Sequence, residues 1–241
     1  MSYISGGDIR DKTVLLTGGT GALGHVVAER FIREGAHVAT SYLFEDELKH
    51  LPSDFKSSVE TIRADVTDDE EVAALFLQVT KKSRRVDILI NIVGGFLGRT
   101  PVKDVKTKDW DHMMNMNLKS VFLCSREFLR QGGGSSYGRI ISMAAMPALK
   151  PTAGRAPYAV SKAGVVVFTA ALGEELKGSG ITANALAPSI IRTAANVQSM
   201  PEEDAAKWVT PEQIAETMLF LCTKSADAIN GACIPVYGGI S

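Results

Sequence analysis

The chain has 241 residues, of which 45% are hydrophobic, and its 26 basic and 27 acidic residues leave a formal net charge of −1. This length fits one large α/β domain or two small ones, and it allows a substantial buried core. The balanced charge gives no electrostatic footprint for nucleic acid or for an acidic membrane surface. We therefore expect neither nucleic acid nor a membrane among the partners.

Cysteine and histidine spacing favours neither a disulfide framework nor a metal site. Cys124, Cys222 and Cys233 lie in apolar runs without a CxxC pair, and the four histidines lack HxxxH or HxH spacing. The first ten residues show no basic-then-apolar signal, and we expect no apolar run of about 18 residues. These features predict a cytoplasmic protein without a metal.

Strand-like apolar runs alternate with segments of helical periodicity along the chain. Strands are expected at 13–17, 37–41, 59–63, 87–91, 138–143, 181–186 and 232–236, and helices near 22–34, 45–51, 68–82, 109–131, 156–178 and 211–223. Because the strands are continuously apolar, the sheet should be parallel and covered on both faces. The predicted fold is α/β, a doubly wound Rossmann-type parallel sheet of about seven strands with helices on both faces. We expect a single domain over residues 1–241.

The first strand leads through a glycine-rich turn, TGGTGALG, into the first helix. Gly18, Gly21 and Gly24 leave room for a tight turn and for a pyrophosphate at the helix N-terminus. A tight turn without a ligand is the alternative, but its place on the first strand–helix junction favours nucleotide binding. Thr20 and Leu23 of the same turn are included among the predicted coenzyme-binding residues.

The third and fourth strands also end in candidate binding residues. Asp65 and Val66 could contact an adenine amino group, although the following Thr-Asp-Asp-Glu also begins a helix. Asn91 and Gly94 would bring open backbone beside a ribose, or would form an ordinary turn.

Two segments are too long to be simple connections. Residues 94–109 and 188–208 follow the fourth and sixth strands, where parallel sheets bind ligands, so we expect them to form the rim and lid of a substrate site. The lid carries Ile190, Ile191 and Met200, with Val197 and Trp208, which suggests an apolar pocket.

The helix expected at 156–178 is apolar around most of its circumference. Residues 165–168, Val-Val-Val-Phe, cannot all face one sheet, so part of this helix should meet another subunit. Cover by the protein's own loops is the alternative. We expect a homodimer or a homotetramer.

Seven short motifs occur in an order and spacing that resemble the single-domain short-chain dehydrogenase/reductase family. They are TGGTGALG (17–24), ADVTD (64–68), DILINIVG (87–94), MNMNLKSVF (114–122), YAVSK (158–162), NALAPSIIRT (184–193) and VYGG (236–239). The resemblance covers essentially the whole chain. It implies an NAD(P)-dependent oxidoreductase that moves hydride between nicotinamide and a carbonyl or secondary alcohol substrate.

The resemblance also assigns roles to individual residues. Tyr158 would exchange a proton with the substrate oxygen, and Lys162, one helical turn later, would favour the phenolate and hold ribose hydroxyls. Asn117 would anchor a water molecule that links Lys162 to solvent. Ile191 and Thr193 would contact the coenzyme. The alternatives are that Tyr158 and Lys162 are merely a pair on a helix surface and that Asn117 marks a helix kink.

The chain departs from the family pattern inside its motifs. Ala145 stands thirteen residues before Tyr158, where the family has serine, and Ile92 and Ser189 replace an asparagine and a glycine. Loss of one preorganised donor costs about 10²–10³ in rate, so reduced activity is expected unless Thr152 or Ser189 substitutes. The alternative is a homologue that has lost catalysis and acts as a dinucleotide-binding sensor or scaffold subunit.

The end of the second strand bears on the choice of dinucleotide. Tyr42 stands where NAD-preferring relatives have an aspartate, so no acid is expected to repel a 2′-phosphate there. Ser41 and Tyr42 offer hydroxyls, but the glycine turn has no Arg or Lys. The pattern leans to NADP over NAD.

Overall fold

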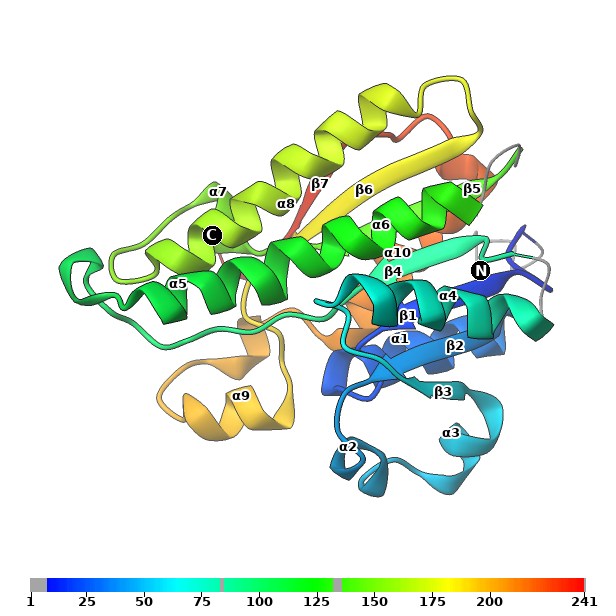
Figure 1. Ribbon diagram of the computed structural model, residues 1–241. Helices are drawn as coiled ribbons and strands as arrows, with labels where there is room; N and C mark the ends of the chain where they lie inside the picture. Colours follow the sequence, from blue (N-terminus) through cyan, green and yellow to red (C-terminus); the bar gives the residue numbers. More distant parts are fainter. Residues whose placement is uncertain (1–7, 83–84, 132–135, 241) are drawn as a thin grey trace.

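The computed structural model describes residues 8–82, 85–131 and 136–240. Its strands form one seven-stranded sheet in the order β3-β2-β1-β4-β5-β6-β7, and every pairing is parallel (Figure 1). The strands are β1 Thr13–Thr17, β2 His37–Tyr42, β3 Glu60–Arg63, β4 Ile88–Asn91, β5 Gly138–Met143, β6 Ile181–Pro188 and β7 Cys233–Val236. The predicted Rossmann-type fold is confirmed, and each strand lies where the apolar runs placed it.

The helices differ from expectation in their interruptions. The described residues form α1 Ala22–Arg33, α2 Asp46–Lys49, α3 Ser53–Ser58, α4 Asp69–Lys82, α5 Thr107–Met114, α6 Ser120–Gln131, α7 Met146–Leu149, α8 Ala156–Glu175, α9 Ala194–Ser199 and α10 Pro211–Cys222. The helix expected near 109–131 is divided by a π-helical stretch, Asn115–Lys119. The expected lid contains α9, which the sequence pattern did not predict.

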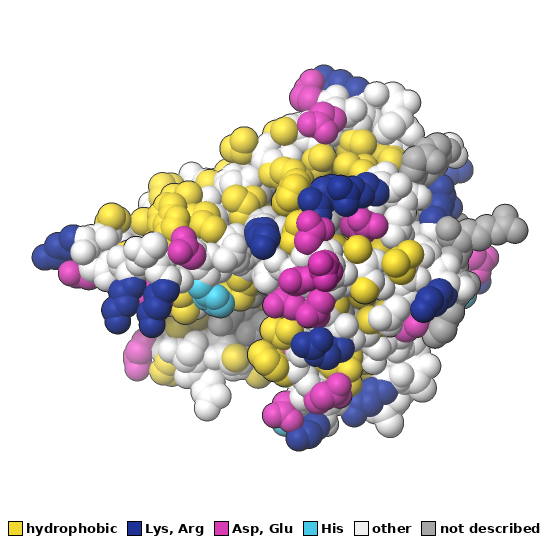
Figure 2. Space-filling view, in the orientation of Figure 1, with side chains coloured by type: hydrophobic (Ala, Val, Ile, Leu, Met, Phe, Trp, Pro, Cys, Tyr) yellow, Lys and Arg dark blue, Asp and Glu magenta, His cyan; other side chains and the backbone are white. Residues whose placement is uncertain are grey.

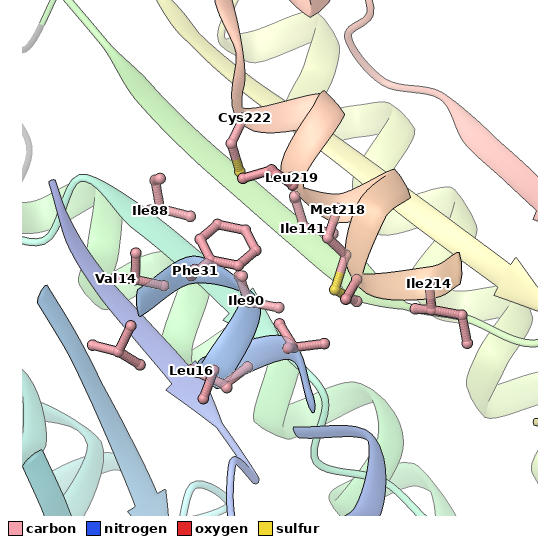
Figure 3. Packing of buried hydrophobic residues seen from close by; sticks show 14 of the residues in the cluster. Val14, Leu16, Phe31, Ile88, Ile90, Ile141, Ile214, Met218, Leu219 and Cys222 are labelled. Atoms are coloured by element: carbon pink, nitrogen blue, oxygen red, sulfur yellow. The ribbon is translucent and has the colours of Figure 1, made fainter. Parts of the chain in front are cut away.

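Both faces of the sheet are buried, which explains the continuous apolar strands. Val14 and Leu16 of β1 pack on the face covered by α1 and α10, whereas Leu15 between them packs toward α4 and α6. In Figure 1 the helices α4, α6 and α8 lie in front of the sheet and α1 and α10 behind it. Figure 3 shows Phe31 of α1 packed beside α10 and the sheet.

The strand order reverses between β1 and β4. These neighbours end in register, because Thr17 is paired with Asn91, and the chain leaves them in different directions. Such a switch point opens a crevice at the carboxyl ends of the strands, where ligands bind in this class of sheet. The loops that follow the central strands therefore meet at this crevice.

Helix α8 bears on the expectation that the chain has no apolar run of about 18 residues. Among the described residues it is long and apolar enough, by length and composition, to cross a membrane, with a mean hydropathy of 1.3 in its most apolar window. However, 39% of that window is buried, and the helix packs against β5 and β6. These contacts are those of a helix that covers a sheet.

Candidate active site

A large cavity lies at the carboxyl ends of the strands. It has a volume of about 940 Å³ and extends from the glycine turn after β1 to α9. Figure 2 shows the surface hollowed between α5 and α9. Its volume is at the upper end of the range of ordinary ligand pockets, so it has room for a large ligand.

Most of the predicted site residues line this cavity. They are Gly18, Thr20, Gly21, Leu23, Gly24, Tyr42, Asp65, Val66, Gly94, Tyr158, Lys162, Ile191 and Thr193. Asn91 and Asn117 are outside the lining. Because segments after six different strands contribute, the arrangement follows from the doubly wound topology rather than from any one loop.

The glycine turn leaves the first turn of α1 open to the cavity. Gly21 is the N-cap, with no side-chain cap and no acidic residue in the first turn of the helix. A Cβ on Gly24 would come within 2.2 Å of the Gly18 carbonyl oxygen, so the turn can close only with glycine there. Uncapped amides at a helix N-terminus fit a diphosphate, as expected of a dinucleotide site.

The end of β2 holds an acid that the sequence pattern missed. Glu47, at α2, lines the cavity and accepts hydrogen bonds from Thr20 Oγ1 at 2.5 Å and from the backbone amides of Leu43 and Phe44 at 3.0 and 2.9 Å. Burial acts to raise the Glu47 pKa, but these hydrogen bonds outweigh it and hold the pKa below its usual range. The expectation of no acid at this end is therefore wrong.

Tyr42 is also engaged by an acid. Its hydroxyl donates to Glu45 Oε1 at 2.8 Å, and that hydrogen bond raises the Tyr42 pKa. The acidic run after β2 was the signal that could have revealed these contacts, since a carboxylate can turn back onto the amides of its own turn.

Asp65 orders a turn after β3, while its contact with an adenine amino group stays a prediction. Its Oδ1 accepts from the Thr67 amide at 2.8 Å and from Thr67 Oγ1 at 2.7 Å, which orders the approach to α4. Asp65 and Val66 also line the cavity. Capping the turn does not remove Asp65 from the site.

Asn91 faces away from the cavity. Its Nδ2 donates to Ser142 Oγ of β5 at 3.2 Å, and the side chain is buried. The cavity is lined instead by the residues that follow, Ile92 to Phe96. Asn91 thus ties β4 to β5 and positions that segment.

Asn117 lies in the π-helical stretch and is completely buried. Its Oδ1 accepts from the Gly95 amide at 2.9 Å, while its Nδ2 donates to the Gly95 carbonyl and to Ser161 Oγ, both at 3.1 Å. These contacts fix the segment after β4 against α8, so Asn117 orders the site from outside the cavity. The predicted link through water to Lys162 stays a prediction.

Gly94 fits between two functional side chains. A Cβ at this position would come within 2.6 Å of Asn117 Oδ1 and 3.0 Å of Lys162 Nζ. The absent side chain therefore allows the backbone after β4 to pass directly beside the lysine.

Tyr158 and Lys162 occupy the first two turns of α8, and both line the cavity. The Lys162 ammonium donates to the Met143 carbonyl at 2.7 Å, and burial lowers its pKa to about 8. Burial raises the Tyr158 pKa, and the nearby charge of Arg155 opposes that rise. The raised Tyr158 pKa favours the protonated phenol over the phenolate that the motif suggested.

The serine position is occupied by a methyl group that lines the cavity, Ala145. Ser142 points away to Asn91, as strand alternation predicts. Of the two candidate replacements, Ser189 lines the cavity and donates its hydroxyl to the Tyr237 carbonyl at 2.8 Å, whereas Thr152 is exposed and outside the lining.

The cavity also contains residues that were not predicted individually, although Phe96 and Asn196 lie in the expected rim and lid. Phe96, His112, Asn115, Arg155 and Asn196 line it, together with the predicted Ile190, Ile191 and Met200. The predicted Val197 and Trp208 are outside the lining, since Val197 is exposed and Trp208 is buried in the core. Arg155 had one available signal, because it precedes Tyr158 by three residues and shares its end of α8.

The whole chain is similar to known proteins. A family model described as short chain dehydrogenase matches residues 12–204. A 3-oxoacyl-acyl-carrier-protein reductase FabG of Rickettsia bellii is 31% identical, with 97% of this chain and 98% of that protein covered. The (2S)-(R)-hydroxy(phenyl)methyl-succinyl-CoA dehydrogenase subunit BbsD of Thauera aromatica is also 31% identical, over 97% and 98% of the two chains.

Solved structures agree with the sequence matches. A variant of actinorhodin polyketide ketoreductase with NADPH has a TM-score of 0.88 at 28% identity, covering 95% of this chain and 97% of that one. ElxO with NADP bound gives a TM-score of 0.88 at 27% identity, covering 95% and 98%. The chain therefore belongs to the short-chain dehydrogenases, a family of NAD(P)-dependent oxidoreductases.

Proposed function

We propose that this protein reduces the carbonyl group of a small molecule to an alcohol, with Tyr158 as the proton donor. The observation that carries the proposal is the meeting of Tyr158 and Lys162 with the open first turn of α1 in one cavity of about 940 Å³. A coenzyme diphosphate at α1 would extend toward these residues, because they line the same continuous space. The wall beyond Tyr158 is apolar enough to receive an organic substrate.

The raised Tyr158 pKa favours the reductive direction. Reduced nicotinamide supplies the hydride when it is bound, and the substrate oxygen then needs a proton. Since burial keeps the phenol protonated, Tyr158 is ready to donate at that oxygen. Charged Lys162, held by the Met143 carbonyl, would stabilise the phenolate that is left behind.

We propose NADP(H) as the preferred coenzyme. The structural relatives crystallised with NADPH or NADP support this, and Thr20, Ser41 and Tyr42 place hydroxyls at the adenosine end. The Glu47 carboxylate shares that end, so a 2′-phosphate requires it to move away from Thr20. Dissociation constants for NADPH and NADH test the preference, and tenfold tighter NADH would overturn it.

We propose that turnover is slow, because Ala145 offers no hydrogen bond to the developing alkoxide. The loss of one such donor costs about 10²–10³ in rate. The departures at Ala145, Ile92 and Ser189 favour the alternative of a non-catalytic sensor or scaffold, whereas Tyr158, Lys162 and the open α1 turn in one cavity favour the enzyme.

We propose a homodimer or homotetramer in which α8 meets another copy. On α8, Val167 is 70% and Val160 47% exposed, and Phe122 of α6 is 40% exposed. Figure 2 shows hydrophobic side chains along this face. Apolar side chains this exposed on neighbouring helices support an interface.

A carbonyl panel tests the proposed activity. Oxidation of NADPH and NADH should be followed with aldehydes and ketones, and the alcohol products identified. Tyr158→Phe should lower turnover about 10²–10⁴-fold. Tyr137→Phe, which removes a hydroxyl outside the cavity, is the matched control and should retain turnover. Failure of every carbonyl compound, or full activity of Tyr158→Phe, would refute the proposal.

A further inference from the structure

Arg155 is a charged side chain of the cavity that the proposed reaction does not use. It is the N-cap residue of α8 and lines the wall shared by the main cavity and a smaller one of about 50 Å³. Its Nε is buried without a hydrogen-bond partner. Among the described residues, no carboxylate oxygen lies within the 4.0 Å that defines an ion pair with its guanidinium.

The contacts of Arg155 place it beside the reacting end of the cavity. Its guanidinium lies over the ring of Phe96, 5.1 Å from the centroid, and the same Phe96 ring contacts the Tyr158 ring edge-on, with centroids 5.2 Å apart. Phe96 thus contacts both the Arg155 guanidinium and the Tyr158 ring, so the cation lies close to the proposed proton donor. A small substrate that reaches Tyr158 with its carbonyl can reach Arg155 with another group.

The charges around Arg155 leave its end of the cavity positive. The carboxylates among the described lining residues of the main cavity are Glu47 and Asp65, and both lie at the nucleotide end. Asp109 lines the smaller cavity beside Arg155, but it is not within ion-pair distance. His112 also lines the main cavity.

A buried guanidinium nitrogen without a hydrogen-bond partner, such as Arg155 Nε, is costly unless a ligand accepts its hydrogen bond. Its planar fork of donors matches a carboxylate or a phosphate, and such charge-assisted pairs are stronger than neutral hydrogen bonds. We propose that Arg155 binds an anionic group of the substrate while Tyr158 contacts the carbonyl oxygen. The preferred substrates are then anionic carbonyl compounds such as oxo acids, an inference that rests on the proposed function.

Paired substrates test this inference. Each of a series of 2-oxo, 3-oxo and 4-oxo acids is compared with its methyl ester, and with the matching phosphonate, which distinguishes a carboxylate site from a phosphate site. The wild-type kcat/KM should be at least about tenfold higher for an anionic member of the series than for the ester. Equal kcat/KM for acid, phosphonate and ester throughout the series would overturn the proposal.

Substitutions test whether Arg155 causes the preference for anionic substrates. Arg155→Met should lower kcat/KM for the preferred anion about 10–100-fold more than for the ester, mainly through KM. Arg155→Lys should retain part of the preference. Arg99→Met is the matched control, because Arg99 is an exposed cation that packs near Gly154 outside the cavity lining, and it should change nothing.

Two results would contradict the role of Arg155. An equal fall in kcat for acid and ester would place Arg155 at the carbonyl oxygen, as a substitute for the missing serine. Unchanged kinetics for both would remove it from substrate binding. If no carbonyl compound is reduced at all, the proposed function fails separately. Calorimetry of the same oxo acids with wild type and Arg155→Met then decides, because equal binding or no binding overturns the anion site.

Discussion

Lys162 is buried as a cation within a cavity wall, and this sets the pH range of the reaction. Its pKa is lowered to about 8 by burial, so the ammonium is charged below that pH and neutral above it. Neutral Lys162 cannot stabilise the phenolate of Tyr158. We therefore expect kcat/KM for carbonyl reduction to fall as the pH rises through about 8.

The control for this pH dependence is Lys162→Arg, whose guanidinium stays charged throughout the range. The variant should lose the inflection, whatever its absolute rate. Coincident pH profiles for wild type and Lys162→Arg would show that another group is responsible for the fall.

Ala145 is the residue at which activity can be gained rather than lost. Ala145→Ser places a hydroxyl on the cavity wall where a methyl group now stands, and it should raise kcat by about tenfold or more, up to the 10²–10³ that one well-placed donor contributes. Steady-state kinetics in the Ser189→Ala background is the control. An unchanged kcat in both backgrounds would mean that the substrate oxygen lies elsewhere.

At the scale of elements, the segment after β4 depends on the π-helical stretch and on α8. Gly94→Ala drives a Cβ into Asn117 Oδ1 and Lys162 Nζ, so it should lower kcat strongly and reduce stability by about 1–3 kcal/mol. Neighbouring Gly95→Ala meets only the flexible end of Met116 and should cost less. Thermal unfolding and kinetics of both variants measure the difference. Equal effects would contradict this account of the segment.

The elements also show where sequence patterns are informative. Strand–turn–helix junctions were predictable because glycine spacing and continuous apolar runs report local backbone geometry, as at Gly18 and Gly24. The π-helical stretch was not, since Asn117 makes its contacts with Gly95 and Ser161, which are distant in sequence. Arg155 was missed because its contact with Phe96 is set by tertiary packing, whereas Glu47 bonds the amides of its own turn and could have been found from the acidic run after β2.

At the scale of the whole molecule, helices bury both faces of the sheet, and apolar side chains of α8 remain exposed. Val167→Glu introduces a charge at an α8 position that is 70% exposed, so it should break the proposed oligomer without unfolding the subunit. Sedimentation measures the assembly and circular dichroism the fold.

The control for the interface is Leu77→Glu on α4, where the side chain is 61% exposed. This variant should sediment like the wild type. A wild-type protein that sediments as a monomer, or a Val167→Glu variant with unchanged mass, would contradict the proposed interface. The family, the sheet order and the position of the cavity do not depend on that result.

A single turnover tests proton donation by Tyr158 most directly. Protein loaded with reduced coenzyme is mixed with a reducible carbonyl compound, and the loss of coenzyme absorbance is followed in wild type and Tyr158→Phe. We predict that the variant binds coenzyme with unchanged affinity and that its transfer rate falls about 10²–10⁴-fold. A variant that transfers hydride at the wild-type rate would contradict the account.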